Sequence, residues 1–258
     1  MKAVLKFILK VLPTHTRLSL LQHVRWLRLR REARPYLGEG SECACCGQHW
    51  REFVPAGDPI RQGEQCLRCG AGSRQRLMSL YLTREIGKLP RVRLLHFAPE
   101  ISLTRRIVAL PGVDYLSIDI SPDVALRQGD ITDLPLGDDE FDAVICSHVL
   151  EHVLDDAKAM CEMFRVMKPG GTAYVMVPRD MDLEKTYEDE TIVTPEARYR
   201  AFGQDDHVRM YGRDFVDRLQ AAGFSVRELS TSDIADPANC SKFGLVEDTI
   251  FVCTKPES

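Results

Sequence analysis

The sequence lacks any apolar run long enough to cross a bilayer, which takes about 18 consecutive apolar residues. Its most apolar start, MKAVLKFILKVLP, is interrupted by Lys6 and Lys10, and no small-residue cleavage site follows. Internal repeats and low-complexity tracts are also missing. These absences predict a globular protein of the cytoplasm.

Disulfides are not expected, although the chain has nine cysteines. A reducing cytoplasm favours metal binding over disulfide formation. Five of the cysteines lie close together in the sequence, and the other four are dispersed in apolar or helical contexts. The clustered cysteines therefore predict a metal site.

The net charge of −4 is small but unevenly distributed. Residues 1–36 hold nine Lys/Arg and one Glu, a charge of +8, so the rest of the chain carries −12. Lys2, Lys6 and Lys10 recur every four residues, which indicates a basic amphipathic helical segment. Two interpretations stay open: the segment docks on the body, or residues 1–30 lie on an anionic membrane surface. In the second case the protein would be peripheral to the inner membrane.

The motif C-x2-C-G is found twice, with 19 residues between the two pairs, and supplies Cys43, Cys46, Cys66 and Cys69. Two such turns bring four thiolates into the tetrahedron typical of structural zinc. Four protein ligands leave no open position for chemistry. Cys45 is the spare thiol, and a register that uses it stays open.

From residue 92 onward, short apolar runs alternate with helical patterns. Such alternation predicts an α/β fold with a mostly parallel, Rossmann-like sheet. We expect strands over 92–97, 114–120, 124–130, 141–147, 172–178, 224–229 and 247–255, and helices over 73–86, 102–110, 155–167 and 212–223. The expected organisation is a basic segment over 1–36, a zinc-binding module over 41–75 and an α/β domain over 76–258.

Ligands of open α/β sheets bind at the carboxyl ends of the strands. Asp119 follows one predicted strand and suits two ribose hydroxyls; Asp130 follows the next and suits an adenine amino group. The candidate cofactor-binding residues at these strand ends are Phe97, Ala98, Pro99, Glu100, Asp119, Ile120, Asp130, Ile131, Ser147 and His148.

Four further motifs lie along the same region. They are Asp133-Leu134-Pro135, Phe141-Asp142-Ala143-Val144, Val149-Leu150-Glu151-His152 and Arg165-Val166-Met167-Lys168-Pro169-Gly170-Gly171. Over 92–178 the chain thereby resembles the class I S-adenosylmethionine-dependent methyltransferases, in particular the methyltransferase type 11 group. The whole chain also resembles a bacterial group that joins a C-x2-C-G knuckle to such a domain and carries LHFAPE and FGQxDHVRxYG.

The resemblance implies S-adenosylmethionine as cofactor and methyl transfer to a small-molecule, glycan or lipid-linked acceptor. Two features depart from the family pattern. The first motif, at 96–102, has no glycine, so Ala98 must be small enough and Glu100 must replace the missing acid. Only four residues separate Asp119 from Val124, so the usual helix between the second and third strands must be missing. A non-catalytic scaffold that keeps the fold is the alternative.

The segment 179–212 is a long polar insertion after the fifth strand, where this fold shapes its acceptor pocket. His207 can take a proton near neutral pH, Asp206 can orient it, and Arg209 can hold an anionic acceptor group. These three residues are the candidate catalytic group. The alternative is a solvated loop whose charges pair with each other.

Two other functions fit the sequence less well. The stretch His148–His152 matches H-x-x-E-H of a zinc protease helix, but it directly follows a predicted strand and matches the methyltransferase motif. Nucleic acid is not expected as a partner, because the body is acidic and the cysteine segment lacks a stripe of basic and aromatic residues.

Overall fold

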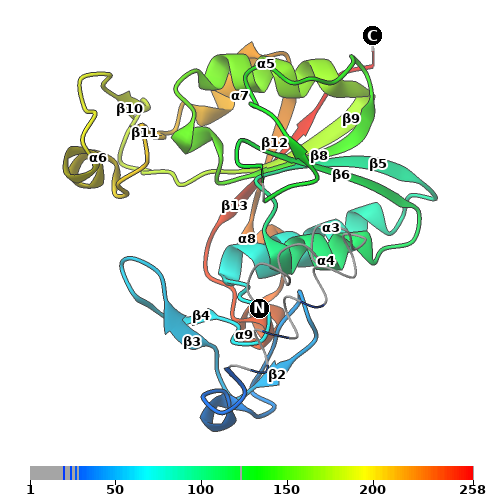
Figure 1. The fold of residues 1–258 in the computed structure, drawn as a ribbon, viewed down its shortest axis with the longest axis vertical. Helices are drawn as coiled ribbons and strands as arrows, with labels where there is room; N and C mark the ends of the chain where they lie inside the picture. Colours follow the sequence, from blue (N-terminus) through cyan, green and yellow to red (C-terminus); the bar gives the residue numbers. More distant parts are fainter. Residues whose placement is uncertain (1–19, 21–23, 25–26, 28, 123, 258) are drawn as a thin grey trace. The chain divides into compact units, whose positions relative to one another are not determined.

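The computed structural model describes residues 20, 24, 27, 29–122 and 124–257 (Figure 1). The predicted basic helical segment and its membrane contact through residues 1–30 lie largely outside them. The chain forms two compact units, described separately below. The cysteine unit comprises 1–91, 100–113 and 229–248, and the sheet unit comprises 92–99, 114–228 and 249–258.

A seven-stranded sheet forms the centre of the sheet unit, in the order β12-β13-β9-β8-β5-β6-β7. The strands are β5 (Val92–Phe97), β6 (Val113–Asp119), β7 (Arg127–Gln128), β8 (Phe141–Ser147), β9 (Met167–Met176), β12 (Ser225–Ser230) and β13 (Thr249–Thr254). The pairs β5–β8, β8–β9 and β6–β7 are parallel, whereas β13 is antiparallel to β9. The predicted Rossmann-like α/β fold is confirmed.

The connection from β6 to β7 is unusually short. The described residues between Asp119 and Arg127 form turns and no helix, as the sequence predicted. β7 has two residues, although a strand over 124–130 was predicted. The strand ends early because Asp130 turns back and pairs with Asp133 in an isolated bridge.

Helix α5 (Asp156–Val166) closes one side of the sheet unit's core. Asp155 caps it by accepting a hydrogen bond from the backbone N–H of Lys158 at 2.9 Å. Its Met160 and Met163 are fully buried, in one cluster with strand residues and with α7 (Phe215–Ala221). The KPGG run lies between the helix predicted over 155–167 and the strand predicted over 172–178. It is part of β9, which therefore starts earlier than predicted and has an irregular register against β8.

The polar insertion of the sheet unit has little regular structure. It contains β10 (Tyr187–Glu188), α6 (Pro195–Phe202) and β11 (Arg209–Met210), and β10 pairs with β11. Before it, the three-residue 3₁₀ helix η2 (Leu150–His152) follows β8. The backbone N–H of Val208 donates to the carbonyl of Glu151 at 2.9 Å, which joins the insertion to η2.

The cysteine unit combines short strands with helices. Its elements are η1 (Arg34–Tyr36), β1 (Ser41–Glu42), β2 (His49–Trp50), β3 (Val54–Ala56), β4 (Arg61–Gln65), α3 (Ser73–Ile86), α4 (Ile101–Val108), α8 (Thr231–Ile234) and α9 (Pro237–Phe243). Helix α3 has the bounds that the sequence predicted. The sequence placed most of α3 in the domain predicted to start at residue 76, whereas the structure groups it with the cysteine unit. Among the described residues, no helix is long and apolar enough to cross a membrane.

Arg76 of α3 joins the parts of the cysteine unit. Its side chain is fully buried and donates to the carbonyls of Glu64, Ala71, Phe243 and Gly244 at 2.7–2.9 Å. Its guanidinium also lies 3.9 Å from the ring centre of Phe53. One side chain thereby connects α3, the end of α9 and the segment that carries the two C-x2-C-G motifs, which we call the cysteine module.

Candidate cofactor-binding site and cysteine cluster

A cavity of about 780 Å³ opens at the carboxyl ends of the strands of the sheet unit. This volume is within the range of about 300–1,000 Å³ that is usual for small-molecule sites. The lining consists of Phe97, Ala98, Ile118, Asp119, Ile120, Gly129, Asp130, Ile131, Thr132, His148, Val149, His152, Val153, Leu154, Asp155 and Asp206. Seven of the ten residues predicted to bind the cofactor are among them.

Two carboxylates line the cavity at neighbouring positions of the sheet. Asp119 ends β6, and its Oδ1 accepts from the backbone N–H of Ser121 at 2.7 Å. Asp130 lies just beyond β7, and its Oδ1 accepts from the backbone N–H and hydroxyl of Thr132 at 2.8 and 2.9 Å. Each carboxylate holds its own turn with one oxygen, so its orientation is fixed before any ligand arrives.

The backbone after β5 has a glycine-like conformation although the first motif contains no glycine. Ala98 adopts a φ of +45°, and its N–H donates to the carbonyl of Ile118 at 3.0 Å. His148, at the end of β8, has a φ of +54°. Non-glycine residues in this left-handed region are uncommon and cluster at functional sites. Alanine, with the smallest side chain after glycine, follows β5 in the conformation that glycine usually provides.

Three predicted cofactor residues are not part of the described lining: Pro99, Glu100 and Ser147. Glu100 belongs to the cysteine unit, where its Oε1 accepts from the side-chain amide of Gln75 at 3.3 Å. Ser147 is buried within the sheet at the end of β8. The structure therefore offers no support for the proposal that Glu100 replaces the family's missing acid.

The insertion contacts an imidazole of the cavity wall. The rings of His152 and His207 lie edge to face with centres 4.7 Å apart, and Oδ2 of Asp206 lies 3.4 Å from Nδ1 of His152. His207 is 7 % exposed and lies outside the described lining, whereas His152 and Asp206 belong to it. Burial lowers the pKa of His207. Asp206 thus lies against His152, not only beside His207 as the sequence suggested.

Arg209 does not have the surroundings expected of an acceptor clamp. It is 3 % exposed and donates to the backbone carbonyls of Leu150, Val153 and Leu154. Its Nε donates to Glu188 at 2.9 Å. A guanidinium whose donors are used in this way holds the insertion against η2. We therefore assign Arg209 a positioning role in place of acceptor binding.

Sequence analysis missed the contribution of η2 and of the three residues that follow it. His152, Val153, Leu154 and Asp155 all line the cavity, and Glu151 is fully buried beside it. The VLEH motif was the available signal, but it was interpreted as a family marker and not as part of the site. The protease interpretation of H-x-x-E-H is excluded here, because η2 is a 3₁₀ turn and not an α-helix that presents both histidines on one face.

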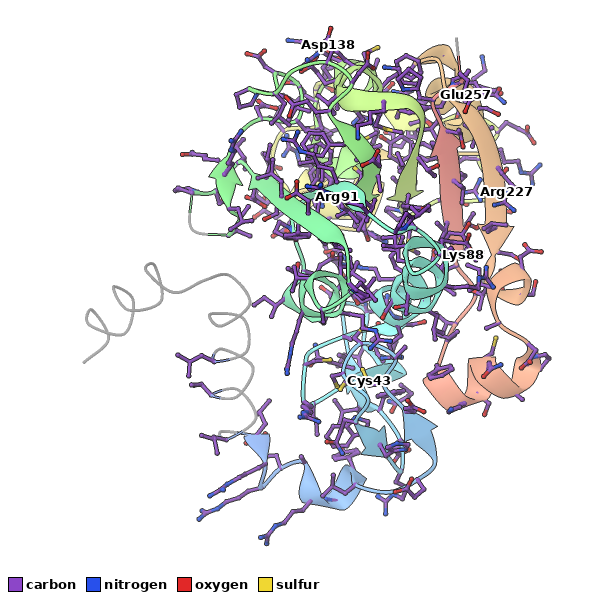
Figure 2. The ribbon with its side chains drawn as sticks, turned by 90° about the vertical axis from the view of Figure 1, so that its right-hand side faces the viewer. Cys43, Lys88, Arg91, Asp138, Arg227 and Glu257 are labelled. Carbon is purple, nitrogen blue, oxygen red and sulfur yellow. The ribbon has the colours of Figure 1, made fainter. Side chains whose placement is uncertain are left out.

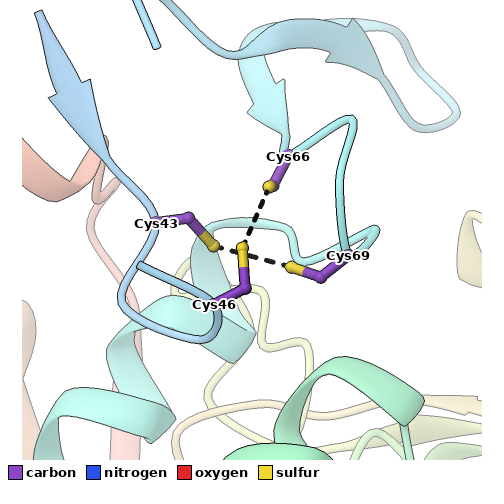
Figure 3. Close-up of side chains that lie close together, drawn as sticks. All are labelled: Cys43, Cys46, Cys66 and Cys69. Atoms are coloured by element: carbon purple, nitrogen blue, oxygen red, sulfur yellow. Dashed lines mark hydrogen bonds between the residues drawn. The ribbon is translucent and has the colours of Figure 1, made fainter. Parts of the chain in front are cut away.

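The four cysteines of the two C-x2-C-G motifs converge (Figure 3). The Sγ atoms of Cys43 and Cys69 are 3.6 Å apart, and those of Cys46 and Cys66 are 3.8 Å apart. Cys43 is labelled in Figure 2, within the cysteine unit. Tetrahedral zinc with Zn–S bonds of about 2.3 Å places its sulfur ligands about 3.8 Å apart. The donor set and its spacing therefore fit zinc.

The two knuckle turns have the geometry that their glycines allow. Gly47 and Gly70 adopt φ values of +67° and +83°, and each donates its N–H to the carbonyl of the first cysteine of its motif. Cys45 is not part of the cluster; its Sγ lies 3.3 Å from the carbonyl of Gln75. This placement favours the register that uses Cys46.

Comparison with known proteins adds independent support for the fold and the cofactor. A family model described as "Methyltransferase domain" (Methyltransf_11) matches residues 101–175. A demethylmenaquinone methyltransferase of Renibacterium salmoninarum is 36 % identical over 101 residues, which cover 35 % of this chain and 43 % of that protein. The chloroplastic 2-phytyl-1,4-beta-naphthoquinone methyltransferase of Arabidopsis thaliana is 31 % identical over 137 residues, 50 % of this chain and 48 % of that protein. The chain thus spans less than half the length of these two relatives.

Solved structures show the same fold at low identity. The [4+2]-cyclase SpnF superposes with a TM-score of 0.52 and 18 % identity, covering 77 % of this chain and 85 % of that one. A putative sarcosine dimethylglycine methyltransferase from Galdieria sulphuraria has a TM-score of 0.50 and 13 % identity, covering 72 % and 87 %. The matched residues, the relatives and the sheet order together support a methyltransferase fold of the class I, S-adenosylmethionine-dependent type in this chain.

Proposed function

We propose that this protein transfers a methyl group from S-adenosylmethionine to a small-molecule acceptor bound in the cavity of the sheet unit. The observation that carries the proposal is the pair of preorganised carboxylates, Asp119 and Asp130, on the wall of one cavity at the strand ends. When bound, the cofactor supplies an electrophilic methyl group on a positively charged sulfur. The fold alone does not decide the activity, since a [4+2]-cyclase shares it.

In this proposal the strand ends hold the cofactor. Asp119 accepts from the ribose hydroxyls, and Asp130 with Ile131 contacts the adenine. Ala98 lets the backbone after β5 approach the methionine part. Phe97, Ile120 and His148 complete the contact.

The acceptor side is formed by η2 with its flanking residues and by the insertion. Val149, Val153 and Leu154 give the cavity an apolar wall. Leu154 is 77 % exposed and is therefore accessible to an apolar ligand. An apolar ring-bearing acceptor suits that wall, and the relatives named above are quinone and naphthoquinone methyltransferases. His152 faces the cavity and can accept a proton, with Asp206 and His207 against it.

Zinc has a separate, structural role in this proposal. The four clustered thiolates would hold one ion per chain and close its coordination, so the ion stabilises the cysteine unit and takes no part in methyl transfer.

The basic segment 1–30 is proposed to contact an anionic membrane surface, on the basis of its lysine spacing and the +8 charge of residues 1–36. Co-sedimentation with vesicles rich in anionic lipid should retain the full chain and release a form that lacks residues 1–30. Equal retention of both forms rules the contact out.

Methyl transfer is tested with cofactor labelled in its methyl group, incubated with the purified full chain and a panel of hydroquinones, phenols and hydroxylated small molecules. A labelled product made by the wild type and not by Asp119→Ala supports the proposal. If the chain binds S-adenosylhomocysteine but labels nothing in the panel or in a soluble or membrane extract, the scaffold alternative replaces it.

A further inference from the structure

The candidate site holds a group of side chains that the cofactor does not explain. Glu151, His152 and His207 each offer one ligand atom, and these atoms lie within 4.8 Å of one another. All three belong to the sheet unit, and the group is separate from the cysteines. We call it the histidine cluster.

Glu151 is the most unusual member of the histidine cluster. Its carboxylate is fully buried, and neither oxygen has a hydrogen-bond partner among the described residues. Its Oε1 lies 3.0 Å from Nδ1 of His148, without the geometry of a hydrogen bond. The His148 imidazole forms an ion pair with Glu151 only when it is protonated. A buried carboxylate without hydrogen bonds is costly, and a bound cation compensates that cost. No lysine or arginine forms an ion pair with Glu151 among the described residues.

His207 is oriented as a ligand. Its ring is hydrogen-bonded to the backbone carbonyl of Phe202, whereas its Nδ1 is buried and has no partner among the described residues. Metal-binding histidines usually donate one ring N–H to a carbonyl in this way, which leaves the other nitrogen with a lone pair for the metal.

The surroundings of the histidine cluster hold it in place on one side and leave it open on the other. The bond from Val208 N–H to the Glu151 carbonyl and the contacts of Arg209 hold the insertion against η2. His152 is 36 % exposed at its side chain and lines the cavity. Two buried ligands behind and one at the cavity wall leave coordination positions that face the cavity.

We propose that Glu151, His152 and His207 bind one divalent transition-metal ion at the cavity wall, with open positions for an oxygen donor of the acceptor. Two imidazoles and one carboxylate with open positions suit Zn²⁺, Fe²⁺, Co²⁺ or Mn²⁺. Ligand bonds of about 2.0–2.2 Å require the side chains to draw together by about 1 Å. With the ion bound, His152 and His207 serve as ligands and not as proton acceptors.

The proposed site narrows the acceptor class, and this part rests on the proposed methyl transfer. A cation beside the acceptor favours a hydroxyl or carboxylate oxygen in its deprotonated form. The expected acceptors therefore carry an oxygen donor next to an apolar body.

Cobalt is the probe, added as Co²⁺ to full-length protein whose cysteine site is loaded with zinc. We expect one Co²⁺ per chain, with visible ligand-field bands. A thiolate-to-cobalt charge-transfer band should be absent, because such a band would mean that Co²⁺ has replaced zinc at the cysteines. His152→Asn and Glu151→Gln should each weaken Co²⁺ binding at least about tenfold. His49→Asn, which removes an exposed imidazole of the cysteine unit, is the matched control and should bind as the wild type does.

The proposal is overturned if His152→Asn binds Co²⁺ with the affinity of the wild type. It is also overturned if the wild type does not bind Co²⁺ stoichiometrically. Because His152 is partly exposed, its variant should keep the wild-type circular dichroism even if Glu151→Gln does not fold. S-adenosylhomocysteine binding is measured on the same samples. If the wild type binds the cofactor but not Co²⁺, only the proposed metal site is ruled out. If it binds Co²⁺ but not the cofactor, only the proposed methyl transfer is ruled out.

Discussion

Half of the residues in the buried core of the cysteine module are cysteines, whereas the core of the sheet unit consists largely of aliphatic and aromatic side chains. The module has little apolar surface of its own, so we expect it to depend on a metal and on buried polar contacts. The sheet unit derives its stability from apolar burial. Its polar side chains are therefore less needed for folding and can form a ligand-binding site. One unit thus uses thiolates for structure, and the other places imidazoles and carboxylates at a cavity.

The largest expected effect is the loss of one zinc ligand. Cys66→Ser should abolish stoichiometric zinc binding and unfold the cysteine module, because structural zinc contributes about 10–16 kcal/mol to small metal-dependent folds. Elemental analysis and thermal unfolding measure the two effects. Cys45→Ser, which changes a buried thiol outside the cluster, should keep one zinc per chain. Unchanged zinc content in Cys66→Ser contradicts the assignment.

Arg76 tests the polar part of the same unit. Arg76→Met leaves several buried carbonyls without donors, and we expect the free energy of unfolding to fall by about 3–5 kcal/mol. Arg76→Lys keeps the charge and part of the bonding, so its loss should be smaller. Denaturant unfolding followed by circular dichroism gives both values. Equal stability of Arg76→Met and the wild type would show that the apolar contacts of the unit suffice.

Asp119 tests the site in the sheet unit. Asp119→Ala removes charge-assisted hydrogen bonds worth about 1.5–3 kcal/mol, so S-adenosylhomocysteine should bind about 10–100-fold more weakly with little change in stability. Asp114→Ala, an exposed carboxylate near the other end of β6, is the control and should leave affinity unchanged. Equal affinities of the two variants would place the cofactor elsewhere.

The smallest effect concerns a polar contact at the edge of the sheet unit. Hydrogen bonds from Arg165 and the backbone N–H of Leu134 hold the pKa of Glu162 below its ordinary value, against the effect of burial. The stabilisation is present above the unfolded pKa of about 4.3 and is lost as pH falls through the lower folded value. Glu162→Gln should therefore be about 1 kcal/mol less stable than the wild type at pH 7 and equally stable near pH 2–3.

Denaturation at several pH values measures this difference, and Glu190→Gln, an exposed carboxylate, should show none. A Glu162→Gln deficit that persists undiminished at pH 2–3 would mean that packing, and not charge, is the source.

Local patterns predicted most of the framework. The C-x2-C-G spacing located the thiolate cluster, and the apolar runs located the strands, because both signals depend on neighbours in sequence. Helices α8 and α9 were missed because each is short and their packing depends on distant residues, such as the contacts of Arg76 with the end of α9.

The site was predicted only in part for the same reason. Strand ends gave Asp119 and Asp130, since the position of a strand end follows from the strand itself. The environment of Arg209 depends on carbonyls more than 50 residues away, so its residue type suggested a ligand contact where the structure shows a positioning role. The contact of His207 with His152 likewise links segments that no local pattern connects.

Calorimetric titration of the purified, zinc-loaded full chain with S-adenosylmethionine and with S-adenosylhomocysteine tests the central claim most directly. The account predicts saturable 1:1 binding of both ligands with half-saturation below about 1 mM, the upper end of ordinary enzyme affinities. Binding should be lost or strongly weakened in Asp119→Ala and retained in Asp114→Ala. No saturable heat with either ligand up to that concentration would contradict the assignment of the cavity to this cofactor.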